Sequence, residues 1–317
     1  MKHKSLTLYL DWTPNINHIG FFVAKDLGFY EDLEIGINLL DPSIDNYKVT
    51  PAKKVELGES NFALCPFESV ISYRTKDRPF DLIAIAAILQ KDLSAIAVED
   101  SKIISPKYLD SKTYASYGAR YEDLIVKQMI LNDGGKGTIN IKYPDKLGIW
   151  ETLLSKKYDS TWIFLNWEGI EAKSKNISLK YFKMCDFKIP YSYSPVIVGS
   201  EKFCFENQDL VEKFLIATKK GFLFSMSNRS KAADILRKFL PDYEKEINLI
   251  DALEETAEAF LDNNTWGKMR ESKLSEFVNW LKENNIVKSD VSSKNLFTNE
   301  LKISYACRCV HFLMNNE

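Results

Sequence analysis

The feature that most constrains the fold is a regular alternation of strand-like and helix-like segments along the chain. The most apolar segment, residues 82–89, has eight residues without a polar side chain. A short, continuously apolar run of this kind is typical of a parallel strand that is covered on both faces. The alternation of such strands with helices predicts an α/β fold.

The segments before residue 98 give the first part of this pattern. A helix at residues 17–27 should end at Gly28, because glycine is favoured just after a helix. A second helix carries Val55 and Leu57 and should stop at Gly58. The other segments expected here are strands at 5–10, 35–40, 61–64 and 94–98, and a helix that begins in 69–75.

A second α/β unit is expected after residue 100. Its predicted strands are 113–116, 139–143, 160–164 and 178–183, its helices are 122–132, 147–154 and 167–173, and 194–200 is a return strand. From Asp209 onward the pattern is mostly helical, since apolar residues recur with a period near 3.6. The apolar face of the first of these helices is formed by Leu210, Phe214, Ala217, Phe222 and Leu223.

This order predicts two α/β lobes with a ligand cleft between them. The chain has 317 residues, enough for two lobes of about 150 residues each. We expect one lobe from residues 1–95 plus 196–317 and the other from 96–195. The chain would cross between them near 93–99 and 192–199, and these crossings would act as hinges. This is the layout of a hinged two-lobed ligand-binding protein.

The charge balance and the apolar runs exclude several classes of protein. Lys plus Arg number 42 and Asp plus Glu number 44, so the basic excess of a nucleic-acid-binding protein is absent. No apolar run reaches the roughly 18 residues of a membrane span. The basic start is followed by an apolar stretch, 6–10, that is too short for a signal peptide. We therefore expect a cytoplasmic protein, or a periplasmic or surface protein whose signal has been trimmed.

Five scattered cysteines do not predict a disulfide framework. Cys307, Cys309 and His311 form an incomplete zinc set whose spacing fits none of the usual patterns. We expect no metal there, and a terminal segment that packs through its apolar side chains.

The first candidate site follows the first predicted strand. Trp12 can offer a flat face to a planar ligand, and Asn15 and His18 can form hydrogen bonds to it. Ligands in open α/β sheets bind at the carboxyl ends of strands. The alternative is that Asp11 or Asn17 only caps the helix and that Trp12 belongs to the core.

Two further candidate sites pair an aromatic residue with an acid after a strand. Phe67 and Glu68 follow strand 61–64, and Trp167 and Glu168 follow strand 160–164. A carboxylate beside an indole suits an aminopyrimidine, because the acid accepts a hydrogen bond from the amine while the rings stack. The alternative is an ordinary acid in the first turn of a helix, next to a core aromatic ring.

The remaining candidates are tyrosines and an anion-binding group. Ser116, Tyr117, Arg120 and Tyr121 precede the predicted helix 122–132, where an arginine can bind an anion and tyrosines can stack. The alternative is a capped helix with a solvated arginine. Tyr193 lies in a proline-bracketed segment at the second crossing, where it is either a cleft wall or part of a rigid linker.

A family resemblance rests on the opening motif Leu10-Asp11-Trp12-Thr13-Pro14-Asn15, followed by His18, Gly20, Ala24 and Gly28-Phe29-Tyr30. The chain resembles the thiamin-pyrimidine family of periplasmic-binding-protein folds. That family includes formylaminopyrimidine-binding proteins and yeast-type hydroxymethylpyrimidine phosphate synthases. The resemblance continues through Gly58, Phe62-Ala63, Ala87, Leu89, Trp167-Glu168-Gly169, the segment 211–222 and Phe297-Thr298-Asn299-Glu300.

The resemblance implies a type II periplasmic-binding-protein fold whose cleft takes a 4-amino-2-methylpyrimidine. Glu168 matches the family's acid that holds the aminopyrimidine edge, and Trp12 with Tyr117 or Tyr121 would flank the ring. Asn15, His18 and Ser116 would be further contacts. The resemblance also makes the permease of an ABC transporter a possible partner.

The synthase branch of that family carries a lysine for pyridoxal phosphate and a histidine one turn later. Cys65 and Ser69 fall at those places here, and without an amine no Schiff base forms. We therefore expect neither a catalytic residue nor a cofactor. Two alternatives remain open: an enzyme of thiamin-pyrimidine biosynthesis that uses Cys65, His18 and Glu68, and a small-anion-binding protein that uses Arg120.

Overall fold

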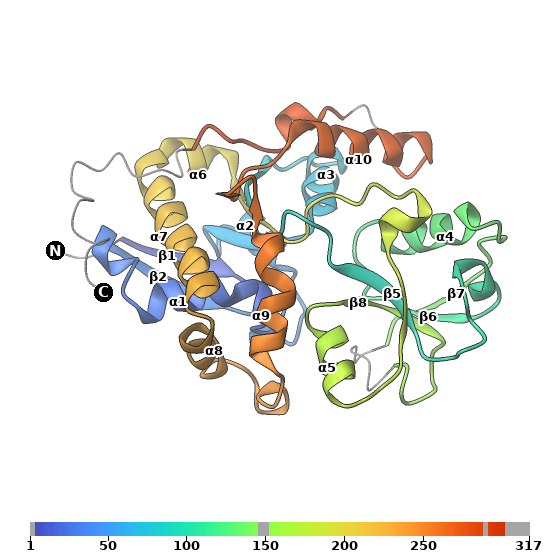
Figure 1. Cartoon of the computed structure of the whole chain (residues 1–317). Helices are drawn as coiled ribbons and strands as arrows, with labels where there is room; N and C mark the ends of the chain where they lie inside the picture. Colours follow the sequence, from blue (N-terminus) through green and yellow to red (C-terminus); the bar gives the residue numbers. More distant parts are fainter. Residues whose placement is uncertain (1–3, 145–151, 288–290, 302–317) are drawn as a thin grey trace.

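Two five-stranded sheets form the framework of the computed structural model, which describes residues 4–144, 152–287 and 291–301 (Figure 1). The first sheet has the strand order β2-β1-β3-β10-β4. Its strands are β1 (Lys4–Tyr9), β2 (Ile35–Leu40), β3 (Phe62–Cys65), β4 (Leu82–Ala87) and β10 (Val196–Ser200). Strand β1 pairs in parallel with β2 and β3, whereas β10 is antiparallel to both β3 and β4.

The expectation that the apolar run 82–89 is a strand in parallel pairing was wrong. Strand β4 is fully buried as expected, but its sheet partner is the antiparallel β10. The cause is topological, because β10 returns from the second sheet and inserts between β3 and β4. Bridges from Ala84 to Phe297 and from Ala87 to Gly267 cover the outer edge of β4, which explains why a terminal strand of the sheet is so apolar.

The second sheet has the strand order β7-β6-β8-β5-β9. Strand β6 is parallel to β7 and β8, and β5 is antiparallel to β8 and β9. The segment 93–99, where we expected a crossing, is mostly strand β5 of this sheet, so the chain crosses before it. The strands are β5 (Ser94–Val98), β6 (Thr113–Ala115), β7 (Asn140–Lys142), β8 (Ser160–Phe164) and β9 (Lys180–Phe182).

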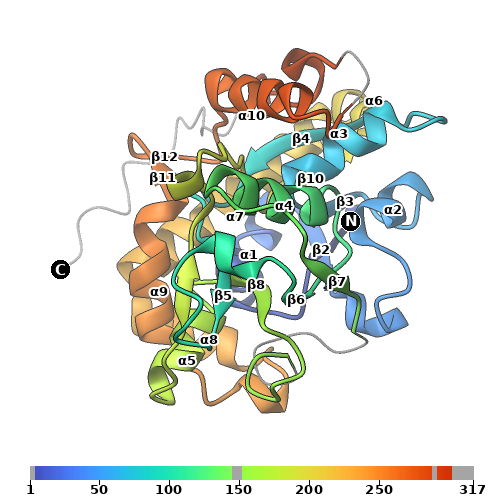
Figure 2. The ribbon, with the colours of Figure 1, turned by 90° about the vertical axis from the view of Figure 1, so that its right-hand side faces the viewer.

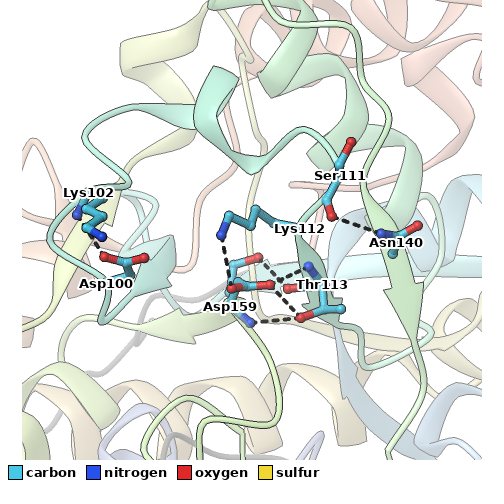
Figure 3. A network of polar contacts seen from close by, with 8 residues as sticks. Asp100, Lys102, Ser111, Lys112, Thr113, Asn140 and Asp159 are labelled. Carbon is cyan, nitrogen blue, oxygen red and sulfur yellow. Dashed lines mark hydrogen bonds and ion pairs between the residues drawn. The ribbon is translucent and has the colours of Figure 1, made fainter.

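A polar network aligns the strands of the second sheet where they begin (Figure 3). Oδ2 of Asp159 accepts hydrogen bonds from the backbone nitrogen and from the hydroxyl of Thr113, both at 2.7 Å. The backbone nitrogen of Asp159 donates in return to the carbonyl of Thr113 at 3.0 Å. Nearby, Asn140 donates to the carbonyl of Ser111 at 3.0 Å. These bonds fix the register of β6 against β7 and β8.

Helices α1 (Ile19–Asp26), α7 (Gln208–Ser227), α8 (Arg229–Arg237) and α9 (Leu249–Ala257) lie beside the first sheet (Figure 1). Gly28 follows α1 with a φ of 74°, as expected of a glycine after a helix. On α7 the expected apolar face is buried at Phe214, Ala217 and Phe222. Leu223 was wrongly assigned to that face, because it lies one helical step from Phe222 and is 37% exposed.

The other helices are α2 (Pro51–Glu56), α3 (Phe67–Thr75), α4 (Glu122–Asn132), α5 (Glu168–Ser174), α6 (Glu201–Glu206) and α10 (Glu271–Glu283), and β11 (Leu261–Asp262) and β12 (Thr265–Trp266) form a small hairpin. Among the described residues, no helix combines the length and the apolar character needed to cross a bilayer. Most of the expected helix 147–154, and all of the Cys307, Cys309 and His311 set, lie outside the described residues.

One hydrophobic core cluster contains residues from both sheets. Val196 of β10, Ile96 of β5 and Phe277 of α10 all belong to it. Figures 1 and 2 show α10 close to α3, on the side of the molecule where the chain crosses between the sheets. The segments that cross between the two sheets are therefore packed into a hydrophobic core and are not a flexible linker.

Candidate functional site

Three aromatic rings meet between the two sheets. Trp12 follows β1, and its ring centroid lies 4.8 Å from that of Tyr47 and 5.7 Å from that of Tyr117. Tyr117 follows β6 of the second sheet, so the carboxyl ends of strands from both sheets supply this aromatic cluster. The sequence predicted Trp12 and Tyr117 but missed Tyr47. Tyr47 lies seven residues after the end of the predicted strand 35–40, so the strand-end signal used for the other residues could have found it.

The carboxylate of Glu168 lies at the first turn of α5. Its Oε2 accepts a hydrogen bond of 2.9 Å from the backbone nitrogen of Phe164, and burial raises the pKa of Glu168 to about 7. Its neighbour Trp167 is buried and packs in the core cluster that includes the first sheet. The indole nitrogen of Trp167 donates to Glu244 at 3.4 Å.

Glu244 is a second acid at this place, and the sequence analysis missed it. Burial raises the pKa of Glu244 to about 7, and the charge of Glu168 contributes to the increase. A carboxyl group whose ionisation is hindered by a neighbouring carboxylate favours a ligand with a positive charge or with several hydrogen-bond donors. Glu244 lies in the helical second half of the chain, and the sequence around it resembles that of an ordinary exposed turn. No sequence signal therefore marked it as a site residue.

Asn15 and His18 form hydrogen bonds within the loop that carries Trp12. The backbone nitrogen of Asn15 donates to Nδ1 of His18 at 3.2 Å, and Oδ1 of Asn15 accepts from the backbone of Asn17. Because Nδ1 is an acceptor, the proton of His18 is on Nε2, which donates to Asp11 at 2.7 Å. Both ring nitrogens of His18 are thus occupied. Asn15 and His18 form a capping box that holds the loop, whereas the alternative considered for this segment named Asp11 or Asn17 as the cap.

Asn166 links the two halves of the molecule. Its amide nitrogen donates to Oδ1 of Asn17 at 2.8 Å and to the hydroxyl of Thr256 at 2.9 Å. All three residues are buried. The sheets are held together here by hydrogen bonds as well as by the aromatic cluster.

Glu68 lies at the start of α3 and is only 3% exposed. Its Oε1 accepts a hydrogen bond of 2.7 Å from the hydroxyl of Tyr191, and its Oε2 has no partner among the described residues. Burial raises the pKa of Glu68 to about 8. Burial also raises the pKa of the Cys65 thiol, so the thiolate that an enzymatic role would need is disfavoured.

Phe67 and Tyr193 are parts of the packed crossing region. Phe67 is fully buried, and its backbone nitrogen donates to the carbonyl of Tyr193 at 3.0 Å. The hydroxyl of Tyr193 accepts from the backbone of Arg270, and the ammonium group of Lys273 lies 4.3 Å from the ring centroid. Phe67 and Tyr193 therefore join the start of α3 to the segment before β10, and Tyr193 also joins that segment to Arg270 and Lys273.

The loop before α4 is ordered by its own hydrogen bonds. The hydroxyl of Ser116 donates to Asp123 at 2.7 Å and accepts from the backbone of Gly118 at 2.9 Å. Tyr121 has a φ of 62° and is half-buried, whereas Arg120 is exposed. Among the described residues, no three His, Cys, Asp or Glu side chains are grouped so that they could hold a metal ion.

The two mixed α/β sheets, with aromatic and acidic side chains gathered between them, define a protein with the two-lobed periplasmic-binding-protein fold. A Candida albicans protein described as having the generic periplasmic-binding-protein fold has a TM-score of 0.69 at 13% identity, covering 95% of this chain and 99% of that chain. The ligand-binding component of an ABC-type import system from Staphylococcus aureus has a TM-score of 0.67 at 14% identity, covering 95% and 100%.

The sequence is also similar to a formylaminopyrimidine-binding protein from Halalkalibacterium halodurans. The two are 21% identical over 303 residues, covering 93% of this chain and 90% of the relative. The model of the NMT1/THI5-like family matches residues 15–232, and the chain belongs to this family. The fold and the family resemblance expected from the sequence are confirmed.

Proposed function

We propose that this protein binds a thiamin-related aminopyrimidine, of the hydroxymethylpyrimidine or formylaminopyrimidine type, between its two lobes. The observation that carries the proposal is the aromatic cluster around Trp12, to which both sheets contribute, together with the half-buried carboxyl group of Glu168. The name of the relative from H. halodurans supports this class of ligand.

The chemistry of the two groups is complementary to an aminopyrimidine. An indole ring can stack on the flat heterocycle, and Tyr117 closes on it from the other sheet. A carboxylate can accept a hydrogen bond from the exocyclic amine or hold a protonated ring nitrogen. Because burial keeps the pKa of Glu168 near 7, a bound donor or cation would stabilise its ionised form.

The lobes proposed for closure are residues 1–95 with 196–317 and residues 96–195, with the first boundary moved ahead of Ser94 because β5 belongs to the second sheet. The hinges are where the chain crosses between the sheets. Delivery of the ligand to the permease of an ABC transporter, in salvage or biosynthesis of the thiamin pyrimidine, is part of the same proposal. The likeness to the S. aureus import component supports it at the level of the fold.

Isothermal titration with 4-amino-5-hydroxymethyl-2-methylpyrimidine and with formylaminopyrimidine tests the proposal. We expect Glu168→Gln to weaken binding by tenfold or more, equivalent to about 1.4 kcal/mol. Glu271→Gln is a matched control, since Glu271 is the first residue of α10 as Glu168 is of α5, and it should bind like the wild type. Absence of binding by the wild type, or unchanged affinity of Glu168→Gln, would overturn the proposal. Binding of sulfonates or nitrate in place of pyrimidines would favour the small-anion alternative.

A further inference from the structure

A basic pocket of about 440 Å³ opens beside the aromatic cluster, lined among others by Lys48, Lys53, Glu56, Tyr73, Lys76 and Arg120. Most of its wall comes from α2, α3 and the residues that directly flank these helices, which belong to the half of the molecule with the first sheet. Arg120 comes from the loop before α4, beside the second sheet. The pocket therefore lies between the two halves.

Two of the basic side chains of the pocket form ion pairs with a carboxylate in its wall. Glu56 accepts from the ammonium group of Lys53 at 2.6 Å and from that of Lys76 at 2.5 Å. These bonds hold the pKa of Glu56 below its usual value, so this carboxylate stays charged. The ammonium group of Lys76 also lies 4.2 Å from the ring centroid of Tyr73. The carboxylate of Glu56 thus pairs with both lysines, and the three side chains together carry one net positive charge.

Lys48 and Arg120 add two further positive charges to the lining. Both side chains are exposed, and no ion pair joins either of them to a described residue. Four basic side chains therefore face one carboxylate, which leaves a net charge of three. Such a concentration of positive charge in a concave site attracts an anion of high charge density.

The same two chain segments line the pocket and build the aromatic cluster. Lys48 directly follows Tyr47, and Arg120 lies three residues after Tyr117. Tyr47 and Tyr117 are the two rings that contact Trp12. An anion in the pocket would be held from both halves of the molecule.

We propose that the basic pocket binds a phosphate group, either as inorganic phosphate or as a phosphate monoester. The planar guanidinium group of Arg120 can donate two parallel hydrogen bonds to phosphate oxygens. Lys48, Lys53 and Lys76 balance the charge of the dianion. The proposal rests on this pocket and does not depend on the proposed pyrimidine ligand.

Isothermal titration of the full chain at low ionic strength, in a chloride buffer, tests the proposal with two probes. Inorganic phosphate and phenyl phosphate distinguish the free anion from an ester, and tighter binding of either one supports the proposal. Arg120→Gln should weaken phosphate binding about tenfold, and Arg120→Lys should weaken it less, because charge remains while the bidentate geometry is lost. Lys268→Gln removes one exposed positive charge outside the pocket and should bind phosphate like the wild type.

Two results would overturn the proposal. One is the absence of phosphate binding by the wild type, and the other is equal weakening by Lys268→Gln and Arg120→Gln, which would show unspecific attraction by net charge. Glu168→Gln should bind phosphate normally. If the wild type binds phosphate but neither pyrimidine, the proposed function is contradicted and the pocket proposal stands.

Discussion

Asn166 and Asn17 are 149 residues apart in the chain, yet their side-chain amides share a hydrogen bond of 2.8 Å. Asn17 belongs to the loop that follows β1 of the first sheet, and Asn166 follows β8 of the second. Both side chains are buried, so solvent does not compete for the bond. This pair joins the two halves next to the candidate site.

Replacement of Asn166 by alanine should weaken this junction. The change removes the bonds to Asn17 and Thr256 and leaves buried acceptors without a donor, which costs about 1–3 kcal/mol of unfolding free energy. Urea denaturation measures the loss. Asn140→Ala is the control, since it removes one exposed bond within the second sheet and should cost about 0.5 kcal/mol. Equal stability of Asn166→Ala and the wild type would contradict a linking role.

Glu68 predicts a pH dependence of stability. Its pKa is raised from 4.5 to about 8 in the folded protein, so the folded state binds a proton more tightly than the unfolded state. The contribution of Glu68 is therefore fully present below pH 4.5 and is lost as the pH rises to about 8. The raised pKa values of Glu168 and Glu244 act in the same direction.

Glu68→Gln should remove the part of this dependence that Glu68 causes. Between pH 5 and pH 8.5 we expect the unfolding free energy of the variant to fall by roughly 1–3 kcal/mol less than that of the wild type. Glutamine keeps an acceptor for the hydroxyl of Tyr191, so the packing is retained. Chemical denaturation over this pH range provides the measurement, and parallel curves for both proteins would rule the explanation out.

The crossing of α1 and α7 depends on two glycines. A Cβ atom at Gly221 would lie 2.0 Å from the carbonyl oxygen of Gly20 and 2.9 Å from Cβ of Ala24. Gly221→Ala should therefore push the helices apart and destabilise the protein by about 3 kcal/mol or more. Gly36→Ala is the matched control, because its nearest neighbours would be at ordinary contact distances of 3.6 Å or more. Thermal unfolding compares the two, and similar melting temperatures would show that the helices can adjust.

Trp12→Ala should lower the affinity for the proposed aminopyrimidine about fivefold, which corresponds to about 1 kcal/mol for the loss of one stacking ring. Tyr108→Ala, which removes an exposed ring of the second half, should have no effect. Titration of both variants against the wild type gives the comparison. If Tyr108→Ala weakened binding as much as Trp12→Ala, the aromatic cluster would not be the binding surface.

Much of the fold could be predicted because local patterns were sufficient for it. Strands β2, β5 and β8 and helix α4 have the bounds expected from apolar runs, turns and caps. The antiparallel position of β10 could not be predicted, since no local pattern specifies which strand a returning segment will join. The apolar run of β4 was attributed to parallel pairing, whereas the bridges to Phe297 and Gly267 complete its burial.

The candidate site was predicted only where a strand end marked it. Trp12, Tyr117 and Glu168 were found in this way and lie between the sheets. Tyr47 was missed although it follows a predicted strand, and Glu244 was missed because it reaches the site through tertiary packing from a segment that resembles an ordinary turn. His18 was predicted to contact the ligand, and in the structure its two ring nitrogens bond within its own loop.

The position of β10 between β3 and β4 has a consequence for the order in which the nascent chain can fold. Residues 94–182, which include all five strands of the second sheet, leave the ribosome before β10 does. The second sheet can therefore assemble while the first still has an open gap between two of its strands. The outer edge of β4 stays unpaired for longer, until residues 267 and 297 have left the ribosome. The first sheet, which begins the sequence, is thus the last to be completed, and the edge of β4 stays open to other pairing until then.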